Sequence, residues 1–135
     1  SPDIVAHNTE TVPRLYRRVR PNAIYQRTLD ALRQISDWPD VISKTGLMLG
    51  LGESDEEIES VMYDLREVGC EILSLGQFLS PSTRHLAVER WVTPETFDRL
   101  AEVGRMMGFR HVESGPLVRS SYMAHRALDT EENSL

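Results

Sequence analysis

The sequence is poor in cysteine, in long apolar runs and in positive charge, and each shortage excludes a class of protein. The single cysteine, Cys70, excludes a disulfide framework and favours a reducing compartment. One cysteine also cannot hold an iron–sulfur cluster, which takes about four protein thiolates, or three and an open position. No apolar run approaches the roughly 18 residues of a membrane-spanning helix. The net charge of -6 argues against a general nucleic-acid binder.

The chain opens without an initiator methionine and without the pattern of a signal peptide. Ser1-Pro2-Asp3 is followed by neither the basic region nor the apolar region of an export signal. We therefore expect a cytoplasmic protein, or an organellar one whose targeting segment lies upstream. A processed protein, or a part of a longer one, explains the missing methionine.

The composition predicts one globular domain. The chain has 135 residues, of which 40% are hydrophobic and 27% charged, so it can form a core and is not typical of a disordered protein. We expect this domain to extend to about residue 128 and residues 129–135 to form a flexible tail.

Hydrophobic periodicity predicts strands and helices that alternate along the chain. The strands are expected at 3–8, 41–51, 71–79 and 110–118, and the helices at 12–19, 22–35, 54–68 and 93–107. Ser54 and Glu57 form a capping box, and Thr93 precedes a proline at the first helical position. This alternation predicts an α/β protein whose parallel strands are joined by helical crossovers.

The number of βα units is too small for a closed barrel, which needs about 200 residues or more. The chain therefore fits part of a (β/α) TIM-type barrel or a small open sheet. A half barrel leaves an unpaired strand edge and an uncovered apolar face. On physical grounds the chain looks incomplete.

Residues 43–57 are where the sequence most strongly predicts a ligand-binding site. An apolar strand there passes Gly46, Gly50 and Gly52 and runs into an acidic helix start. Ligands of α/β proteins bind at the ends of such strands, and glycines let a flat ligand approach the backbone closely. The helix start would favour an anion, but three acidic residues at 55–57 already occupy that field. A neutral or zwitterionic ligand is therefore favoured over a phosphate.

Polar side chains follow the other predicted strands as well. Because parallel strands end at one edge of a sheet, we expect carboxylates, amides and cations to gather around the glycines there. The side chains concerned are Asn8, Glu10, Glu53, Gln77, Ser80, Arg84 and His85.

Structural interpretations of the same residues stay open. The glycines can serve the turn alone, and Glu53 can be a solvated turn acid. The arginines between Arg14 and Arg20 are expected to form a solvated helix face. His85 and His111 lack the spacing of a metal-binding pair. Core-filling or buried roles are expected for the sulfur-bearing residues Met48, Met62, Cys70, Met106 and Met107.

Several motifs together resemble the lipoyl synthases, a family of radical S-adenosylmethionine enzymes. The motifs are Asn-Thr-Glu-Thr-Val-Pro-Arg-Leu-Tyr at 8–16, Val-Arg-Pro at 19–21, Lys-Thr-Gly-Leu-Met-Leu-Gly-Leu-Gly-Glu at 44–53, Gly-Gln-Phe-Leu-Ser-Pro at 76–81 and Gly-Pro-Leu-Val-Arg-Ser-Ser-Tyr at 115–122. The Gly-Leu-Gly-Glu and Arg-Ser-Ser-Tyr motifs are specific when they occur together. The resemblance covers nearly the whole chain and is to the C-terminal half of that enzyme.

The resemblance implies a partial (β/α)6 barrel and a chemistry. Lipoyl synthases insert two sulfur atoms at C6 and C8 of an octanoyl chain carried on a lysine of a lipoyl domain or of the glycine-cleavage H protein. One 4Fe-4S cluster, held by a Cys-xxx-Cys-xx-Cys motif, cleaves S-adenosylmethionine to a 5′-deoxyadenosyl radical. A second, auxiliary cluster supplies the sulfur and takes three cysteines and a serine as ligands.

The resemblance also implies site residues. The spacing Gly46-x-Met48-x-Gly50-x-x-Glu53 resembles the motif that lines the adenine of S-adenosylmethionine. Strand ends that face the same cavity carry Asn8, Glu10 and Gln77. Of the two serines in the C-terminal motif, Ser121 rather than Ser120 is expected to bind the auxiliary cluster.

The chain departs from the family in one decisive respect: neither cysteine motif lies within it. We therefore expect no cleavage of S-adenosylmethionine by this chain alone. One alternative is a non-catalytic remnant or binding module of the same fold, and another is a phosphate-binding half of an unrelated (β/α)8 enzyme. The Arg-Ser-Ser-Tyr motif favours the lipoyl synthase over the latter, because a phosphate site has no need of it.

Overall fold

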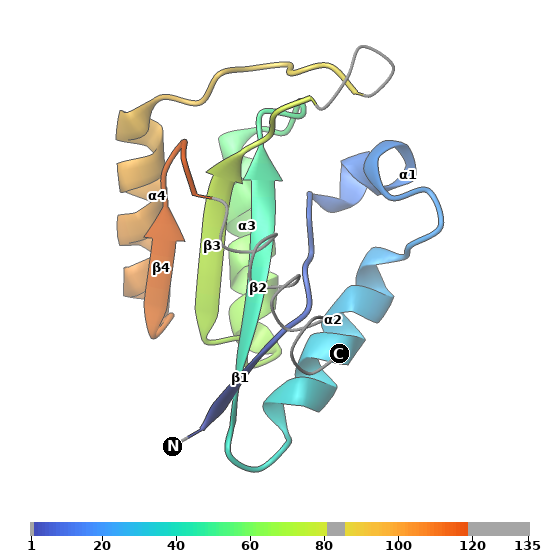
Figure 1. Ribbon diagram of the computed structural model, residues 1–135, viewed down its shortest axis with the longest axis vertical. Coiled ribbons are helices and arrows are strands. Elements are labelled where there is room, and N and C mark those ends of the chain that lie inside the picture. Colours follow the sequence, from blue (N-terminus) through green and yellow to red (C-terminus); the bar gives the residue numbers. More distant parts are fainter. Residues whose placement is uncertain (1, 81–85, 119–135) are drawn as a thin grey trace.

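The predicted strands and helices are present in the structure, a computed structural model that describes residues 2–80 and 86–118 (Figure 1). The strands are β1 (Asp3–Ala6), β2 (Val41–Leu49), β3 (Ile72–Gln77) and β4 (His111–Ser114). The helices are α1 (Tyr16–Val19), α2 (Tyr25–Ser36), α3 (Asp55–Glu67) and α4 (Pro94–Met107), and a short 3-10 helix, η1 (Pro13–Leu15), precedes α1. Most of them are shorter than predicted, because strand and helix ends depend on neighbours that the local sequence does not show.

The strands form one parallel sheet in the order β1-β2-β3-β4, so each lies beside its neighbour in sequence. Parallel crossovers are right-handed, and a sheet that grows in one direction therefore carries its helices on one face. A doubly wound sheet reverses its strand order and has helices on both faces. The fold is thus α/β with the topology of part of a TIM-type barrel, as predicted.

The core lies between the helices and the sheet. Side chains alternate along a strand, so Leu47 and Leu49 of β2 face the helices with Leu73 and Leu75 of β3. The helices contribute the buried side chains Leu32, Ile58, Val61, Met62, Leu65, Phe97 and Leu100 to the same cluster. Ile42, Lys44 and Gly46 of β2 lie on the opposite face, which we call the open face.

The helix caps predicted from the sequence are present in the structure. The Ser54 hydroxyl accepts a hydrogen bond from the Glu57 amide at 3.1 Å, and the Glu57 carboxylate accepts one from the Ser54 amide at 2.9 Å. Thr93 caps α4 through the Thr96 amide, and Gly108 ends it with a φ of 104°. Among the described residues, the helices all fall short of the length and apolar character that a membrane crossing requires.

The prediction that the methionines fill the core is correct for Met62 and wrong for Met106. Met62 is fully buried, whereas 81% of Met106 is exposed. At about 100° per residue, Met106 lies roughly 180° around α4 from Phe97, which points into the core. Met48 and Met107 are half-buried and pack against the core.

Cys70 is fully buried, as predicted. Its sulfur lies 3.5 Å from the Ile72 carbonyl oxygen and 3.7 Å from that of Ser43. Burial in this apolar setting raises the pKa of the thiol to about 12. A thiol reagent at about pH 8 should therefore leave the native chain unlabelled.

This expectation is checked with Ellman's reagent on the native and the guanidinium-unfolded chain. Labelling of one thiol per chain on unfolding, and negligible labelling before it, is the expected result, since the sequence holds a single cysteine. Native labelling at the rate of a free thiol would contradict the buried position.

Candidate functional site

The predicted site segments meet at the C-terminal edge of the sheet. The segment after β1 pairs with β2, where the Glu10 amide donates to the Gly46 carbonyl and Glu10 accepts from the Met48 amide, each at 2.9 Å. The chain after β2 contacts the chain after β3, where the Glu89 amide donates to the Gly50 carbonyl at 2.7 Å. Figure 1 shows the connection from β3 to α4 running past this edge of the sheet. The expected gathering of strand ends is present.

Glu53 is buried, so its interpretation as a solvated turn acid is wrong. Only 5% of the residue is exposed, and its carboxylate accepts hydrogen bonds from the amides of Gly50 at 2.7 Å and Leu51 at 3.0 Å. The Arg90 guanidinium lies 3.7 Å away. The carboxylate therefore shapes the loop at residues 50–53 by satisfying its amides.

Gly50 is needed for a contact within the chain. Its φ is 100°, and a Cβ there would overlap the Arg90 carbonyl oxygen and the Gln77 side-chain amide. The amides of Glu89 and Arg90 both donate to the Gly50 carbonyl. The close approach that this glycine permits is thus made by residues 89–90.

Gln77 ends β3 on the helix-facing side, because it alternates in step with Leu73 and Leu75. Its side-chain amide donates to the carbonyls of Phe78 and Arg90, each at 3.0 Å, and its oxygen accepts from the Val92 amide at 2.9 Å. These bonds hold the segment at residues 90–92 against the sheet. Sequence analysis missed this role, although counting alternate residues along β3 would have indicated the face.

The segment at residues 7–10 is held in an unusual conformation. Glu10 has a φ of 75°, in a region that residues other than glycine rarely occupy. The Thr9 amide and hydroxyl lie 3.0 and 2.7 Å from the Thr45 hydroxyl, which donates to the His7 carbonyl at 2.8 Å. Such strain persists where surrounding bonds determine the conformation, and it is found preferentially at functional sites.

The open face of the sheet carries small and charged side chains beside two buried isoleucines, Ile42 and Ile72. Gly46 pairs in register with Ser74, and Ser74 pairs with Glu113. The Lys44 ammonium lies 3.6 Å from the Glu113 carboxylate, to which the Ser74 hydroxyl donates at 3.3 Å. This part of the face therefore places an ion pair and a hydroxyl beside a glycine, opposite the apolar core.

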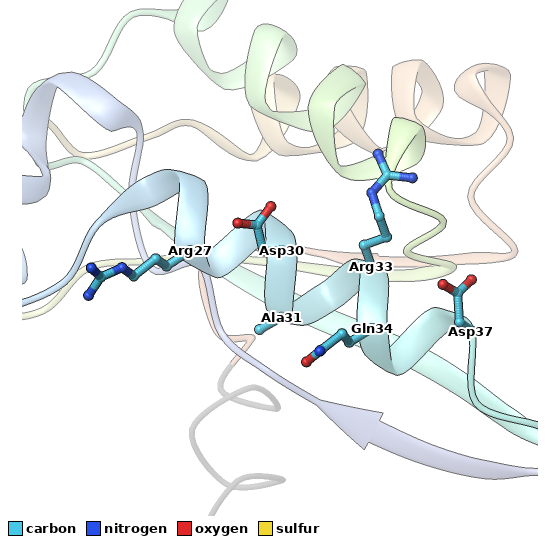
Figure 2. Close-up of a pocket in the computed structure, with 6 residues that line it drawn as sticks. All are labelled: Arg27, Asp30, Ala31, Arg33, Gln34 and Asp37. Carbon is cyan, nitrogen blue, oxygen red and sulfur yellow. The ribbon is translucent and has the colours of Figure 1, made fainter.

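A cavity of about 280 Å³ adjoins two of the predicted site residues, Asn8 and Glu10. It is also lined by His7, Arg20 and Trp38. A larger hollow, of about 450 Å³, is lined by six residues of α2 and its C-terminal end. Figure 2 shows these six side chains splayed apart along one helix. The cavity beside Asn8 is therefore the better candidate for a ligand.

The arginines at 14–20 form a largely solvated face, as predicted: Arg14, Arg17 and Arg18 are exposed, and Arg20 is half-buried. Arg14 and Arg18 each donate to a backbone carbonyl of the loop at 50–53, both at 2.8 Å. Arg20 donates to the Asn8 carbonyl at 3.2 Å. The prediction did not include these hydrogen bonds, which exposed arginines make to the backbone of the neighbouring segments.

The described residues do not fit an iron–sulfur cluster. Within residues 2–80 and 86–118, no three histidine, cysteine or acidic side chains gather in a way that could hold a metal ion. Cys70 is buried on the helix side of the sheet, away from the open face. Four predicted site residues lie outside the described residues, namely Arg84, His85, Ser120 and Ser121.

Comparison with known proteins gives the family. No family model matches the chain. The lipoyl synthase of Thioalkalivibrio sulfidiphilus is 58% identical over 124 residues, or 91% of this chain, and that of Caldanaerobacter subterraneus is 52% identical over the same share. The lipoyl synthase of Geobacter sulfurreducens is 58% identical over 92% of this chain. The chain belongs with the C-terminal part of the lipoyl synthases.

The match to lipoyl synthases confirms the family that the motifs indicated. The chain spans only about two-fifths of the length of these relatives, with 39%, 44% and 41% of the three proteins covered. The remaining three-fifths of a lipoyl synthase have no counterpart in the printed sequence. The roles of individual residues remain predictions.

A test of the loop at residues 50–53 compares two glycines. Gly50 and Gly52 both have positive φ, but the nearest atoms to a Cβ at Gly52 lie 3.7 Å away. Gly52→Ala should cost about 1–2 kcal/mol of unfolding free energy from the backbone alone. Gly50→Ala should cost about 2–4 kcal/mol, because it adds an overlap with Arg90 and Gln77. Urea unfolding measures both, and equal losses would contradict the contact.

A second test concerns the ion pair that ties α3 to η1. The Arg14 guanidinium donates to both carboxylate oxygens of Glu57, at 2.8 and 2.9 Å. This bond, aided by the Ser54 amide, lowers the pKa of Glu57 from 4.5 to about 2. A lowered pKa stabilises the folded chain above the unfolded-state value, and this contribution is lost as the pH falls toward the folded-state value.

The stability difference between the wild type and Arg14→Met should therefore shrink as the pH falls from about 4.5 to about 2. Urea unfolding across this range measures it. Arg17→Met serves as the control, and its stability difference should stay constant. A constant difference for Arg14→Met as well would show that the pair does not titrate as expected.

Proposed function

We propose that the chain acts as the C-terminal part of a lipoyl synthase. The reaction of that enzyme is the insertion of two sulfur atoms at C6 and C8 of an octanoyl chain on a protein lysine. The observation that carries the proposal is the identity of 52% to 59% with lipoyl synthases over more than nine-tenths of the chain. The substrate proteins are octanoylated lipoyl domains or the glycine-cleavage H protein.

In this proposal the described residues form one wall of the S-adenosylmethionine site. Asn8 and Glu10 adjoin Gly46 and Met48 through the hydrogen bonds that link β2 to the segment after β1. Gly46 has no side chain to project from the open face toward a ligand, and Asn8 and Glu10 line the cavity at the β1 edge of the sheet. Bound beside a reduced iron–sulfur cluster, S-adenosylmethionine supplies the radical chemistry of this family.

Three of the residues predicted to bind the cofactor interact with the chain itself in the structure. Glu53 and Gln77 each use both of their polar side-chain atoms on backbone groups of the chain, and Gly50 admits residues 89–90. We propose that they shape the wall and do not touch the ligand. This assignment keeps the family motif at 46–53 but divides it into a ligand-facing part and a supporting part.

The clusters require cysteines that this chain does not hold. Its single cysteine is buried and has a pKa of about 12. We propose that a cysteine-bearing N-terminal part holds both clusters, in the same polypeptide or in a partner. Ser121 would then complete the ligands of the auxiliary cluster with a hard oxygen that sulfur can displace.

The test combines the chain with the N-terminal part of a related lipoyl synthase. After reconstitution with iron and sulfide under reducing conditions, the isolated chain should form no 5′-deoxyadenosine from S-adenosylmethionine, and the mixture should form it. Turnover by the isolated chain would contradict the division of roles. Binding of S-adenosylmethionine by a mixture that stays inactive would favour a non-catalytic remnant.

Substitution of the two serines sharpens this test. In an active mixture, Ser121→Ala should retain the cleavage of S-adenosylmethionine and lose sulfur transfer to an octanoylated H protein. Ser120→Ala is the matched control and should retain both steps. Loss of sulfur transfer in Ser120→Ala alone would reassign the ligand.

A further inference from the structure

Four side chains of the short helical segment at residues 13–20 donate hydrogen bonds to two loops of the chain. Figure 1 shows η1 and α1 at the same end of the sheet as the arrowheads of β2 and β3. Each of four alternate residues donates to a different backbone carbonyl: Arg14 to Gly52 at 2.8 Å, Tyr16 to Thr9 at 2.6 Å, Arg18 to Leu51 at 2.8 Å and Arg20 to Asn8 at 3.2 Å. Two of these carbonyls follow β1 and two follow β2.

These carbonyls need partners because they lie beyond the ladder of the sheet. A backbone carbonyl without a donor costs free energy when water cannot reach it, and an arginine can donate several bonds from one planar group. In the loop at 50–53, the amides of Gly50 and Leu51 are satisfied by Glu53, and the first carbonyl by residues 89–90. Arg18 and Arg14 supply the donors for the next two carbonyls, so three successive residues of the loop are held by hydrogen bonds.

The segment after β1 depends on the same helix. Tyr16 is 5% exposed, and its hydroxyl also lies 3.2 Å from the Thr28 hydroxyl of α2. Arg20 stacks over the Tyr16 ring at 5.6 Å while it donates to Asn8. The bond from Tyr16 to Thr9 therefore comes from a rigid group and holds the residue that precedes the strained Glu10.

We propose that residues 13–20 form a positioning element that sets the spacing between the segments at 8–10 and 50–53. Arg18 and Tyr16 are its two positioning residues, one for each segment. The two segments follow different strands, and this one helical segment donates to the backbone of both. That the segments face S-adenosylmethionine rests on the proposed function, whereas the bracing itself does not.

The first measurement is amide hydrogen exchange of the chain without any ligand. Arg18→Met should speed exchange of the Leu51 and Gly52 amides by about tenfold, because a hydrogen bond from a charged donor is lost. Exchange at residues 9–11 should stay unchanged. Tyr16→Phe should give the opposite pattern, with faster exchange at Glu10 and no change at the loop.

Two matched controls separate bracing from general loss of stability. Arg17→Met removes an exposed arginine of the same helix, and Arg99→Met removes one that pairs with Asp55 and Glu59 of α3. Neither should change exchange in either segment. Uniform changes that follow the melting temperature, or equal effects of Arg17→Met and Arg18→Met, would overturn the proposal.

The second measurement uses the active mixture of this chain with an N-terminal part. Arg18→Met should raise the KM for S-adenosylmethionine by about tenfold and change kcat by less than about twofold, since a displaced wall weakens binding uniformly. Arg18→Lys should recover part of the loss, because a lysine can still donate one bond to the Leu51 carbonyl. An unchanged KM beside altered exchange would show bracing without any influence on the site, and would overturn the role in cofactor positioning.

The two measurements test the positioning element and the proposed function independently of each other. Hydrogen exchange needs no cofactor, so it decides the bracing even if the mixture binds no S-adenosylmethionine. Absence of binding by the wild-type mixture would overturn the proposed function alone.

Discussion

Hydrogen bonds from side chains to the backbone of residues 50–53 hold the loop at the C-terminal edge of the sheet. Parallel strands end in carbonyls and amides that the ladder no longer satisfies, and each of these groups needs a donor or an acceptor. Here Glu53 accepts from the amides, while Arg18 and Arg14 donate to the carbonyls. The loop can therefore keep positive φ at Gly50 and Gly52 with little freedom.

The fold could be predicted because its signals are local. The capping box at Ser54 and the αL glycine at 108 act within one helical turn, and the alternation of strands and helices decides the parallel topology. The site could be predicted only as a place. Whether Glu53 or Gln77 points to a ligand or to the backbone depends on residues up to fifteen positions away, such as Val92, and composition does not show that. For the same reason the sequence predicts the exposure of Arg14 and Arg18 but not the loop carbonyls to which they donate.

The topology also explains the charged pair on the open face. Helices cover one face of the sheet, so the other face would line the interior of a barrel. A charge in such an interior is costly unless it is paired, and Lys44 has its partner, Glu113, two strands away across Ser74. The paired charges on this face suit the interior of a longer barrel, in agreement with relatives of which this chain covers about two-fifths.

The proposed division between a wall of the cofactor site and the positioning element at residues 13–20 changes how substitutions in this chain should be interpreted. In the proposal Gly46 and Glu10 belong to the wall, whereas Tyr16 and Arg18 donate to backbone carbonyls behind it. Tyr16 holds the segment with the strained Glu10, and Arg18 holds a loop with two left-handed glycines. Under the proposal, a residue of α1 therefore influences cofactor affinity without touching the cofactor, because the carbonyl to which it donates belongs to the wall.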